Sequence, residues 1–408
     1  MEPHDHTRRK SLHVVTSHRC QNDCVFCSDG GAQVRIQRPD PAVVREILER
    51  NRHHDVVCFS THEPTLHSDL VTFVSWAREL GYPTVSLITN GRTLGRNDLA
   101  RRLVEAGLDD LHVSIHGHAA AVHDPITRRA GSFDQALAGL DAALTLRSTH
   151  DLRVTVHSTI TALNLDALPQ MIDFFLERGV DHYGLNGLFL DGLALENYPL
   201  LAVSNPRIAE VLSRALAGPP RPVSVSAIPP CQLVGRLPPW AIGLREDFHM
   251  AVDGEVGGPI PAEATSVTRR FAFGSPCRTC AMRPQCDGVP EAYIARFGWE
   301  EFHPVSAKEA QEERTFVSRE RLETLLSPPA KAWEIIQVTL EPARALVRLR
   351  SARLCGDLVL LLEPMDPGAA AYRRSARYNL SLQGGDHSAD ELALAEEVFD
   401  RIVARETG

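Results

Sequence analysis

The feature that most limits the fold of this chain is a regular alternation of short β-rich runs with amphipathic stretches, from Leu12 to about Asn186. Such alternation is typical of strand-helix units around a parallel sheet. Runs rich in β-branched residues predict the strands, and each is followed by a segment with helical periodicity. The predicted strands span residues 12–16, 55–60, 84–89, 110–116, 152–160 and 181–186.

Six strand-helix units are too few for the common closed barrel, which contains eight. We therefore expect an α/β fold whose main part is a partial (β/α)6 TIM-like barrel. In full barrels the chemistry takes place at the carboxyl ends of the strands. The functional site of this chain is expected at the same end.

Helix-boundary residues agree with this alternation. Asp40 followed by Pro41 predicts a helix start, and Ser132 with Gln135 predicts a capping box. Three glycines follow amphipathic stretches, where left-handed helix ends are expected: Gly81, Gly107 and Gly179.

The second half of the chain has a different organisation. Proline is abundant from Gly218 to Pro239, which predicts a linker and a domain boundary. Beyond residue 330 three further β-rich runs precede a helix capped by Ser388 and Glu391. We predict three domains: a barrel at 11–217, a cysteine-rich module at 218–305 and a small α/β domain of unknown role at 306–408.

Composition and charge exclude several classes of protein. The formal net charge of −9 disfavours nucleic acid as a partner, because a phosphate backbone attracts basic surfaces. No stretch approaches the roughly 20 apolar residues of a membrane span. The first ten residues also lack the apolar region of a secretion signal. The expected location is the cytoplasm, without membrane attachment.

Seven of the nine cysteines fall into two groups, a pattern that favours metal or redox chemistry over disulfides. The first group, Cys20, Cys24 and Cys27, directly follows the first predicted strand. Three thiolates leave one iron of a four-iron cluster without a protein ligand. An open coordination position is the mark of a catalytic metal centre. The ungrouped cysteines, Cys58 and Cys355, are expected to be structural.

The spacing Cys-x3-Cys-x2-Cys, with Phe26 before the last cysteine, resembles the signature of the radical S-adenosylmethionine (radical SAM) superfamily. After the second strand, "STHEPTLH" resembles the family's "GGEP" segment. Glu63 and Pro64 match, whereas Thr61 and His62 stand where two glycines are usual. "LITNGRTL" resembles the "TNG" segment after the third strand, and "LHVSIHG" resembles "VSLDG" on the fourth.

This resemblance covers roughly residues 11 to 190. It implies a [4Fe–4S] cluster that binds S-adenosylmethionine at its open iron, and cleavage to methionine and a 5′-deoxyadenosyl radical. The radical would take a hydrogen atom from a substrate, and a one-electron donor such as flavodoxin or ferredoxin would be a partner. The cofactor-binding residues that the resemblance implies are Phe26, Glu63, Pro64, Asn90, Ser114, Ser158, Ile160 and Asn186.

Alternatives stay open for several of these residues. A zinc knuckle completed by His18 is the other explanation for the first three cysteines. His116, His123 and Asp124 follow the fourth strand, close to the expected site, and are candidates for proton transfer to or from a substrate. An exposed loop histidine is the more common case for such positions.

The second group of cysteines is Cys277, Cys280 and Cys286, with Cys231 upstream. Four thiols complete a four-ligand site. The arrangement resembles the SPASM or twitch modules that carry auxiliary clusters in many radical SAM enzymes. Pro290 occupies the position of a further cysteine of the full SPASM pattern, so one auxiliary [4Fe–4S] cluster is expected. Structural zinc is the alternative.

Two catalytic functions and one other function compete. The first is a maturase acting on a peptide or protein side chain, favoured by the auxiliary-cluster module. The second is an enzyme of small-molecule, cofactor or secondary-metabolite biosynthesis. The third is a scaffold that retains iron–sulfur clusters or zinc without turnover, an idea motivated by the changed "THEP" segment.

Overall fold

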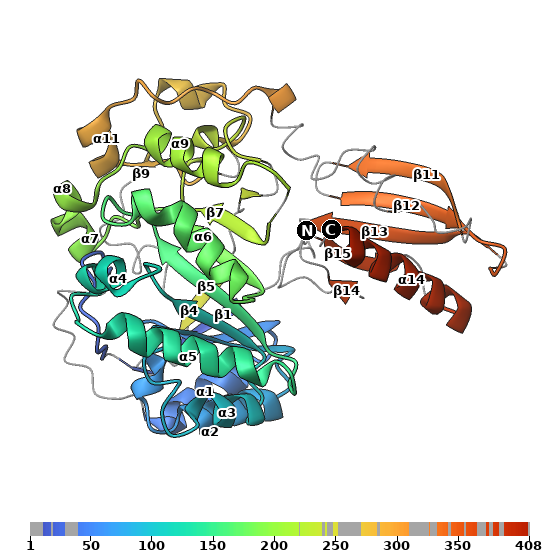
Figure 1. Cartoon of the computed structure of the whole chain (residues 1–408), viewed down its shortest axis with the longest axis horizontal. Coiled ribbons are helices and arrows are strands. Elements are labelled where there is room, and N and C mark those ends of the chain that lie inside the picture. Colours follow the sequence, from blue (N-terminus) through green and yellow to red (C-terminus); the bar gives the residue numbers. More distant parts are fainter. Residues whose placement is uncertain are drawn as a thin grey trace.

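The computed structural model describes two units, one built on a parallel sheet and one on an antiparallel sheet (Figure 1). His18 and Cys355, which the sequence singled out, lie outside the described residues. The described residues are 11–17, 19–28, 40–219, 221–238, 241–242, 248–251, 271–283, 286–309, 326, 333–341, 344–354, 356–364, 373–374, 378–382 and 387–406.

The larger sheet contains eight parallel strands among the described residues, in the order β7-β6-β5-β4-β3-β2-β1-β8. Since β7 and β8 are its two ends, the sheet is open, and the expected α/β partial barrel is confirmed. The strands are β1 (Ser11–Val15), β2 (Val56–Ser60), β3 (Thr84–Thr89), β4 (Asp110–Ser114), β5 (Arg153–Thr159), β6 (His182–Asn186), β7 (Val223–Ser226) and β8 (Phe248–Ala251).

The first six strands agree with the prediction to within two residues at each end. The edge strands β7 and β8 were not predicted. Each has four residues, and β7 lies inside the proline-rich segment, so neither produces a β-rich run of ordinary length. Both come after residue 217, and the division of the chain into three domains stays a prediction.

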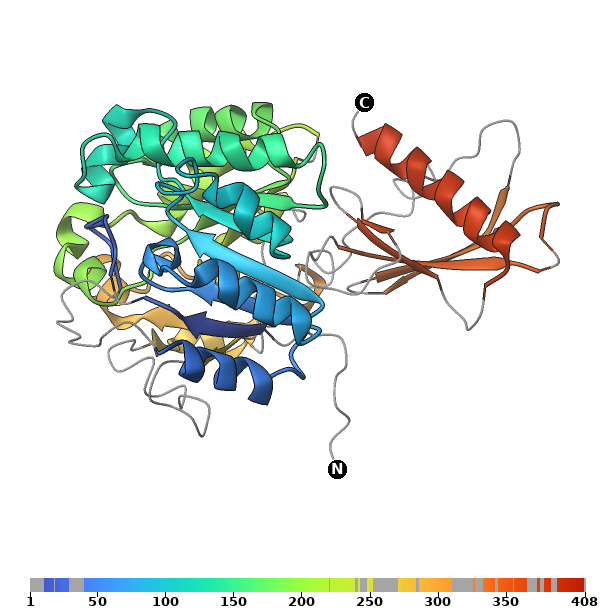
Figure 2. The ribbon, with the colours of Figure 1, turned by 90° about the horizontal axis from the view of Figure 1, so that it is seen from below.

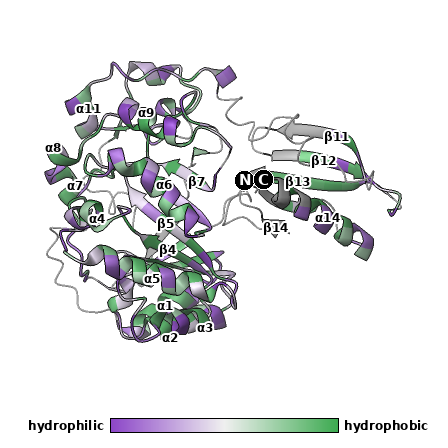
Figure 3. Cartoon of the chain, in the orientation of Figure 1, coloured by the Kyte–Doolittle hydropathy of each residue, from purple (hydrophilic) through white to green (hydrophobic). Residues whose placement is uncertain are grey.

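Helices follow the strands and cover the outer face of the sheet (Figures 1 and 2). In Figure 3 apolar and polar residues alternate along them, as expected for amphipathic helices. The helices are α1 (Pro41–Arg50), α2 (Leu70–Glu79), α3 (Leu99–Glu105), α4 (Ala120–Thr127), α5 (Ser132–Leu146), α6 (Leu168–Glu177), α7 (Leu193–Glu196), α8 (Tyr198–Leu201), α9 (Asn205–Ala215) and α11 (Glu291–Phe297), with 3-10 turns η1 (Pro64–Leu66), η2 (Leu165–Ala167), η3 (Pro230–Gln232) and η5 (Ser275–Arg278).

A continuous apolar core lies between the sheet and helices α1, α2, α3, α5, α6 and α9. It contains alternate residues of the strands, such as Leu12, Leu111 and Val156, all fully or almost fully buried. Successive side chains of a strand point to opposite faces. The intervening residues of β1, β4, β5 and β6 therefore face the concave side of the sheet, and many of them are polar.

The predicted helix signals are partly confirmed. The Asp40 side chain caps α1 by accepting a hydrogen bond from Ala42 N at 2.9 Å. The three predicted C-terminal glycines have left-handed backbones, as expected. The capping box of Ser132 and Gln135 is wrong, because α5 begins after Gly131 and takes its cap from another side chain, described below.

The smaller unit is a five-stranded antiparallel sheet among the described residues, in the order β11-β12-β13-β15-β14. Figure 2 shows α14 along one face of it. Ser388 and Glu391 form the predicted capping box, with Ser388 N donating to Glu391 Oε2 at 2.8 Å. The elements are β11 (Glu334–Glu341), β12 (Arg344–Arg350), β13 (Leu358–Pro364), β14 (Arg373–Arg374), β15 (Tyr378–Leu382) and α14 (Ala389–Glu406), and the short pair β9 (Phe271–Ala272) and β10 (Val289–Pro290) lies in the preceding segment.

Among the helices of the described residues, none combines the length and the apolar character needed to cross a membrane.

Candidate active site

The loop that leaves the carboxyl end of β1 carries Cys20, Cys24 and Cys27. Burial raises the pKa of the Cys24 thiol, and the neighbouring thiols of Cys27 and Cys20 raise it further. Burial also raises the pKa of Cys20 to about 11. These mutual effects mean that the three thiols lie near one another, and their role as cluster ligands stays a prediction.

Hydrogen bonds attach this cysteine loop to two helices far along the chain. Val25 N donates to the carbonyl of Ile126, in α4, at 2.9 Å. Leu193 N, at the start of α7, donates to Cys27 O at 3.0 Å, and Asn197 Nδ2 donates to Val25 O at 2.9 Å. Together these contacts fix the backbone that presents the thiols.

Gly192, just before α7, has a left-handed backbone with φ +49°. A Cβ atom at this position would overlap the carbonyl oxygen of Ser28. Only glycine lets the segment before α7 approach the cysteine loop this closely.

Three arginines surround the same loop. Arg92 Nη1 donates to Gln21 O at 2.9 Å, and Arg129 Nε donates to the same carbonyl at 3.2 Å. Arg128 Nε donates to Asp23 O at 2.6 Å. Guanidinium groups stay charged at all physiological pH values, so the loop is set in a positive environment that suits bound thiolates. The sequence analysis missed Arg92 and Arg129.

Glu63, after β2, is fully buried, and its carboxylate accepts four hydrogen bonds. The donors are Thr65 N at 3.1 Å, Thr65 Oγ1 at 2.5 Å, Thr89 Oγ1 at 2.6 Å and Asn90 N at 2.8 Å. Burial raises the pKa of Glu63, and these bonds oppose the effect. Because a carboxylate has about four acceptor positions, Glu63 is occupied in tying the loop after β2 to the end of β3. Its contact with S-adenosylmethionine stays a prediction.

Asn90, at the end of β3, links that strand to the cysteine loop. Its Nδ2 lies 3.6 Å from Cys20 Sγ, and its Oδ1 accepts from Gln21 Nε2 at 3.2 Å. The structure thus brings Cys20, Glu63 and Asn90 together at the mouth of the barrel. Pro64 is buried beside them as the first residue of η1.

Thr61 and His62 adopt left-handed backbones, with φ +65° and +47°. This conformation costs an L-residue roughly 1–2 kcal/mol, and a β-branched residue is a marked outlier there. The turn after β2 therefore keeps a glycine-like shape although neither residue is glycine. Thr61 and His62 thus differ from the two glycines of "GGEP" in sequence, but they keep a left-handed backbone conformation.

Replacing His62 by glycine is expected to raise the free energy of unfolding by about 1 kcal/mol, because it removes this strain. Urea denaturation followed by circular dichroism measures the change. His53→Gly is the matched control: His53 is an exposed histidine with no left-handed backbone, so its replacement is expected to lower stability. Equal effects of the two changes would contradict the strain argument.

Four of the predicted cofactor residues lie at the ends of β4, β5 and β6. Ser114 is half-buried on the concave face, and Asn186 ends β6 on that same face. Ser158 is fully buried, where it donates to Ile115 O and accepts from Tyr183 OH at 2.8 Å. Its side chain therefore lies in the core, away from the mouth. Ile160 is also buried, and its backbone N donates to Asn186 O at 2.8 Å.

Phe26, His116 and His123 pack together beside the cysteine loop. The Phe26 ring lies edge-on to His116, with centroids 4.8 Å apart. His116 Nδ1 accepts from Thr159 N at 3.2 Å, and His123 Nδ1 accepts from His116 N at 2.9 Å. Burial lowers the pKa of His116 to about 3 and that of His123 to about 4. The expectation of exposed histidines is wrong, and both rings are neutral at physiological pH.

Asp124, the third candidate for proton transfer, caps α5. Its carboxylate accepts from Gly131 N at 2.7 Å, Ser132 Oγ at 2.9 Å and Phe133 N at 2.9 Å. Burial opposes ionisation, but these bonds outweigh it and lower the pKa of Asp124. The cap comes from eight residues before the helix, which is why a local capping box was the wrong prediction.

Asp124→Ala is expected to lower the free energy of unfolding by about 1–2 kcal/mol near pH 7, the usual cost of a lost cap. A lowered pKa means that the ionised group stabilises the fold above its unfolded pKa of about 3.9. The difference from wild type should therefore shrink as the pH falls toward 3. Urea denaturation at both pH values tests this. Asp134→Ala, on the exposed face of the same first turn, is the control, with an expected cost below about 0.5 kcal/mol.

Three buried polar atoms around the cysteine loop have no hydrogen-bond partner: Thr16 Oγ1, Gln21 Oε1 and His123 Nε2. A buried polar atom without a partner costs roughly 1–3 kcal/mol. Their position between β1, the cysteine loop and α4 fits a site that a polar ligand completes. The three thiols and these atoms fit a cluster that carries a polar nucleotide cofactor.

The described residues contain no group of three His, Cys, Asp or Glu side chains arranged around a single metal ion. The cysteines of a four-iron cluster each bind a different iron. Thiols around such a cluster are therefore further apart than the ligands of one ion.

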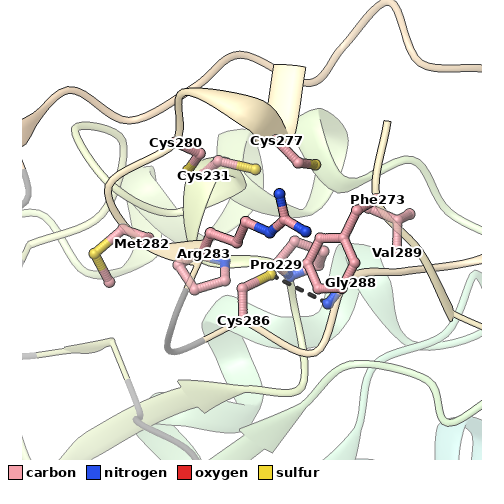
Figure 4. Close-up of a pocket in the computed structure, with 11 residues that line it drawn as sticks. Pro229, Cys231, Phe273, Cys277, Cys280, Met282, Arg283, Cys286, Gly288 and Val289 are labelled. Carbon is pink, nitrogen blue, oxygen red and sulfur yellow. Dashed lines mark hydrogen bonds between the residues drawn. The ribbon is translucent and has the colours of Figure 1, made fainter. Parts of the chain in front are cut away.

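The second group of cysteines lines a pocket, shown in Figure 4. Burial raises the pKa of Cys231 to about 12, and Cys286, Cys280 and Cys277 add to the effect. The four thiols, which come from η3, η5 and the following loop, therefore share one site. The pocket is also lined by Phe273, Met282, Arg283, Gly288, Val289, Pro229 and Pro230.

Backbone donors already point at two of these sulfurs. Val305 N lies 3.4 Å from Cys280 Sγ, and Gly288 N lies 3.3 Å from Cys286 Sγ. Hydrogen bonds to sulfur are one of the ways in which proteins set the potential of an iron–sulfur cluster. The donor set fits a four-cysteine cluster.

The protein is thus an open α/β barrel with three neighbouring thiols on the loop after its first strand. Residues 14–175 match the model of the radical SAM superfamily, and this segment is a radical SAM domain.

Curated relatives match part of the chain. A probable GTP 3′,8-cyclase of Saccharolobus islandicus is 29% identical over 187 residues, which are 45% of this chain and 58% of the relative. A PqqA peptide cyclase of Rhodopseudomonas palustris is 32% identical over 203 residues, 48% of this chain and 50% of the relative. The chain thus spans little more than half the length of the curated relatives it matches.

Solved structures share the fold. SuiB of Streptococcus suis bound to S-adenosylmethionine has a TM-score of 0.51 and 12% identity, over 74% of this chain and 77% of SuiB. SuiB bound to the precursor peptide SuiA gives a TM-score of 0.52 at 12% identity, over 74% and 76%.

Proposed function

We propose that this protein is a radical SAM enzyme that cleaves S-adenosylmethionine reductively and removes a hydrogen atom from a peptide or protein side chain. The observation that carries the proposal is the group of three thiols at the mouth of the open barrel, next to Asn90 and to unpartnered buried polar atoms. Flavodoxin or ferredoxin is the proposed electron donor.

Cys20, Cys24 and Cys27 would hold the [4Fe–4S] cluster, which when bound supplies the electron that cleaves the sulfonium. Other residues of the site hold the cysteine loop and the neighbouring strand ends in place. Arg92 and its neighbours fix the loop backbone and offset the negative charge of the thiolates. Glu63 holds the ends of β2 and β3 together.

A peptide substrate is supported by the PqqA peptide cyclase relative and by the fold shared with a protein bound to its precursor peptide. A small-molecule substrate is the second candidate, because relatives named as probable GTP 3′,8-cyclases match 45% of this chain. We place an auxiliary [4Fe–4S] cluster on Cys231, Cys277, Cys280 and Cys286, with zinc as the alternative.

Anaerobic incubation of the full chain with dithionite and S-adenosylmethionine tests cleavage, with 5′-deoxyadenosine as the product measured. A fully deuterated cell extract, split into peptide and small-molecule fractions, then tests the substrate class. Deuterium in 5′-deoxyadenosine from the peptide fraction, lost after protease treatment, supports a maturase. Deuterium from the small-molecule fraction would overturn that part, and absence of cleavage by iron-loaded protein would favour the scaffold.

Metal analysis of the variant in which all three loop cysteines are alanine isolates the second site. About four irons per chain are expected to remain, and to be lost when Cys231 is also replaced. Bound zinc in place of iron would overturn the auxiliary cluster.

A further inference from the structure

A line of polar side chains crosses the concave face of the barrel from β3 to β7. Ser86 Oγ and His112 Nε2 both lie within hydrogen-bond distance of Asp110 Oδ2, at 2.9 and 2.8 Å. His112 Nδ1 lies 2.8 Å from His157 Nε2. His157 Nδ1 lies 3.4 Å from Asn186 Nδ2. Asn186 Oδ1 in turn accepts from Ser226 Oγ at 2.5 Å.

The hydrogen bonds of this line converge on the Asp110 carboxylate, which accepts from Ser86 on one side and from His112 on the other. The neighbouring His112 and Arg153 outweigh burial and lower the pKa of Asp110, so its carboxylate is ionised and only accepts. His112 Nε2 is then the donor, and its Nδ1 is an acceptor that requires a proton on His157 Nε2. His157 Nδ1 consequently carries a lone pair, directed toward Asn186 at the mouth.

The outer end of the line is its weakest point. The 3.4 Å contact between His157 and Asn186 is longer than an ordinary hydrogen bond, whereas the inner contacts are 2.8 Å. Gly184, beside His157, is needed for this placement, because a Cβ atom there would overlap the imidazole ring. Ser114 is the register neighbour of His157, so the His157 ring lies next to a predicted cofactor residue.

The groups around His157 favour its neutral form. Burial, with His112 and His182, lowers the pKa of His157, and Asp110 opposes this while Arg153 adds to it. Burial lowers the pKa of His182 to about 3 and that of His13, which also faces His112, to about 4. Asp110 is the group in this set that stabilises a proton on the line.

We infer that Asp110, His112 and His157 form a relay that accepts one proton from the molecule bound in the barrel. The proton of a substrate X–H group goes to His157 Nδ1 while the bonding electron pair stays on X. His157 Nε2 passes its own proton to His112 Nδ1. His157 ends neutral, and the positive charge rests on His112 against the Asp110 carboxylate at 2.8 Å.

The inference rests on the proposed function, and the proton balance of that function explains the need for such a group. Joining two X–H groups of a substrate into a bond removes two hydrogens. One leaves as an atom to the 5′-deoxyadenosyl radical. The other leaves as a proton, for the relay, and an electron, for an oxidised iron–sulfur cluster. A neutral base inside the barrel supplies the proton acceptor that the cofactor does not provide.

Ring-nitrogen NMR shifts of the full chain, purified anaerobically and labelled with ¹⁵N-histidine, test the relay directly. At about pH 8 both His112 and His157 are expected as neutral rings protonated at Nε2. On acidification His112 should become imidazolium while His157 changes to the neutral form protonated at Nδ1. Spectra of His112→Gln and His157→Gln assign the signals. A Nδ1 proton on His157 at pH 8, or an unchanged His157 while His112 gains its proton, would overturn the relay.

Asp110→Asn supplies the functional readout. Loss of the carboxylate is expected to lower the proton affinity of the relay at least tenfold, or one pH unit. The acid limb of substrate consumption, measured with the active extract fraction, should move to lower pH by the same amount. Thr155→Val is the matched control: Thr155 neighbours His112 in register and its hydroxyl has no partner, so neither quantity should move.

A shifted NMR midpoint with an unmoved acid limb would show that the relay takes no part in the reaction, and so overturn the inference. Failure of the proposed function looks different, because wild-type protein would then form no 5′-deoxyadenosine while the NMR titration stays measurable.

Discussion

Replacement of Cys24 by alanine is expected to lower the rate of 5′-deoxyadenosine formation by about a thousandfold or more, because two thiolates do not hold a four-iron cluster open to a cofactor. Cys24 is the member of the group whose thiol both neighbours influence. Under the proposed function, its loss removes one cluster ligand and leaves the barrel intact. Liquid chromatography of the anaerobic reaction measures the product, and iron analysis should show about four fewer irons per chain.

Cys58→Ala is the matched control for this prediction. Cys58 is buried in β2, close in sequence to the site but outside both cysteine groups. Its replacement is expected to cost about 1 kcal/mol of stability, the loss of a small buried side chain, and to leave iron content unchanged. Equal loss of iron in the Cys24 and Cys58 variants would show that the three loop cysteines do not hold the cluster.

Glu63→Ala is expected to lower the free energy of unfolding by about 3 kcal/mol or more. The change leaves the hydroxyl of Thr89 and the backbone N of Asn90 buried without their acceptor, and each unsatisfied group costs roughly 1–3 kcal/mol. Urea denaturation measures the loss. Glu79→Ala, on the exposed face of α2, should stay within about 0.5 kcal/mol of wild type.

The pH dependence of Glu63→Gln provides a second check. Burial raises the pKa of Glu63, so its folded form favours the protonated state. The stability that the group adds is complete below the unfolded pKa of about 4.3 and is lost as the pH rises through the folded pKa. The variant should therefore be most destabilised, relative to wild type, at acidic pH. If the stability difference between wild type and Glu63→Gln grows as the pH rises, the raised pKa of Glu63 is contradicted.

The sequence was sufficient where the signal is local. Strand-helix alternation located β1 to β6, and the cysteine spacing located the loop whose thiols the structure groups. It failed where the partner is distant along the chain. Asp124 was a candidate for proton transfer because nothing in its immediate neighbours identifies it as the cap of α5.

The interior of the barrel was the least predictable part. The family resemblance implied Ser158 as a cofactor-binding residue, but the pleat of β5 turns its side chain into the core and presents His157 on the concave face instead. A shift of one residue exchanges the two faces of a strand. The line from Asp110 to Asn186 also depends on the order of neighbouring strands, which the sequence does not state.

The contacts between the cysteine loop and α7 have a consequence for synthesis of the chain. Asn197 and Val25, which share a hydrogen bond, are 172 residues apart. At translation rates of roughly 5–20 residues per second, the ribosome needs on the order of 10–30 s to make that interval. Throughout this time the nascent polypeptide displays three thiols whose supporting segment does not yet exist. These thiols therefore need protection from oxygen while that interval is synthesised, and under the proposed function iron would be delivered only after α7 has emerged.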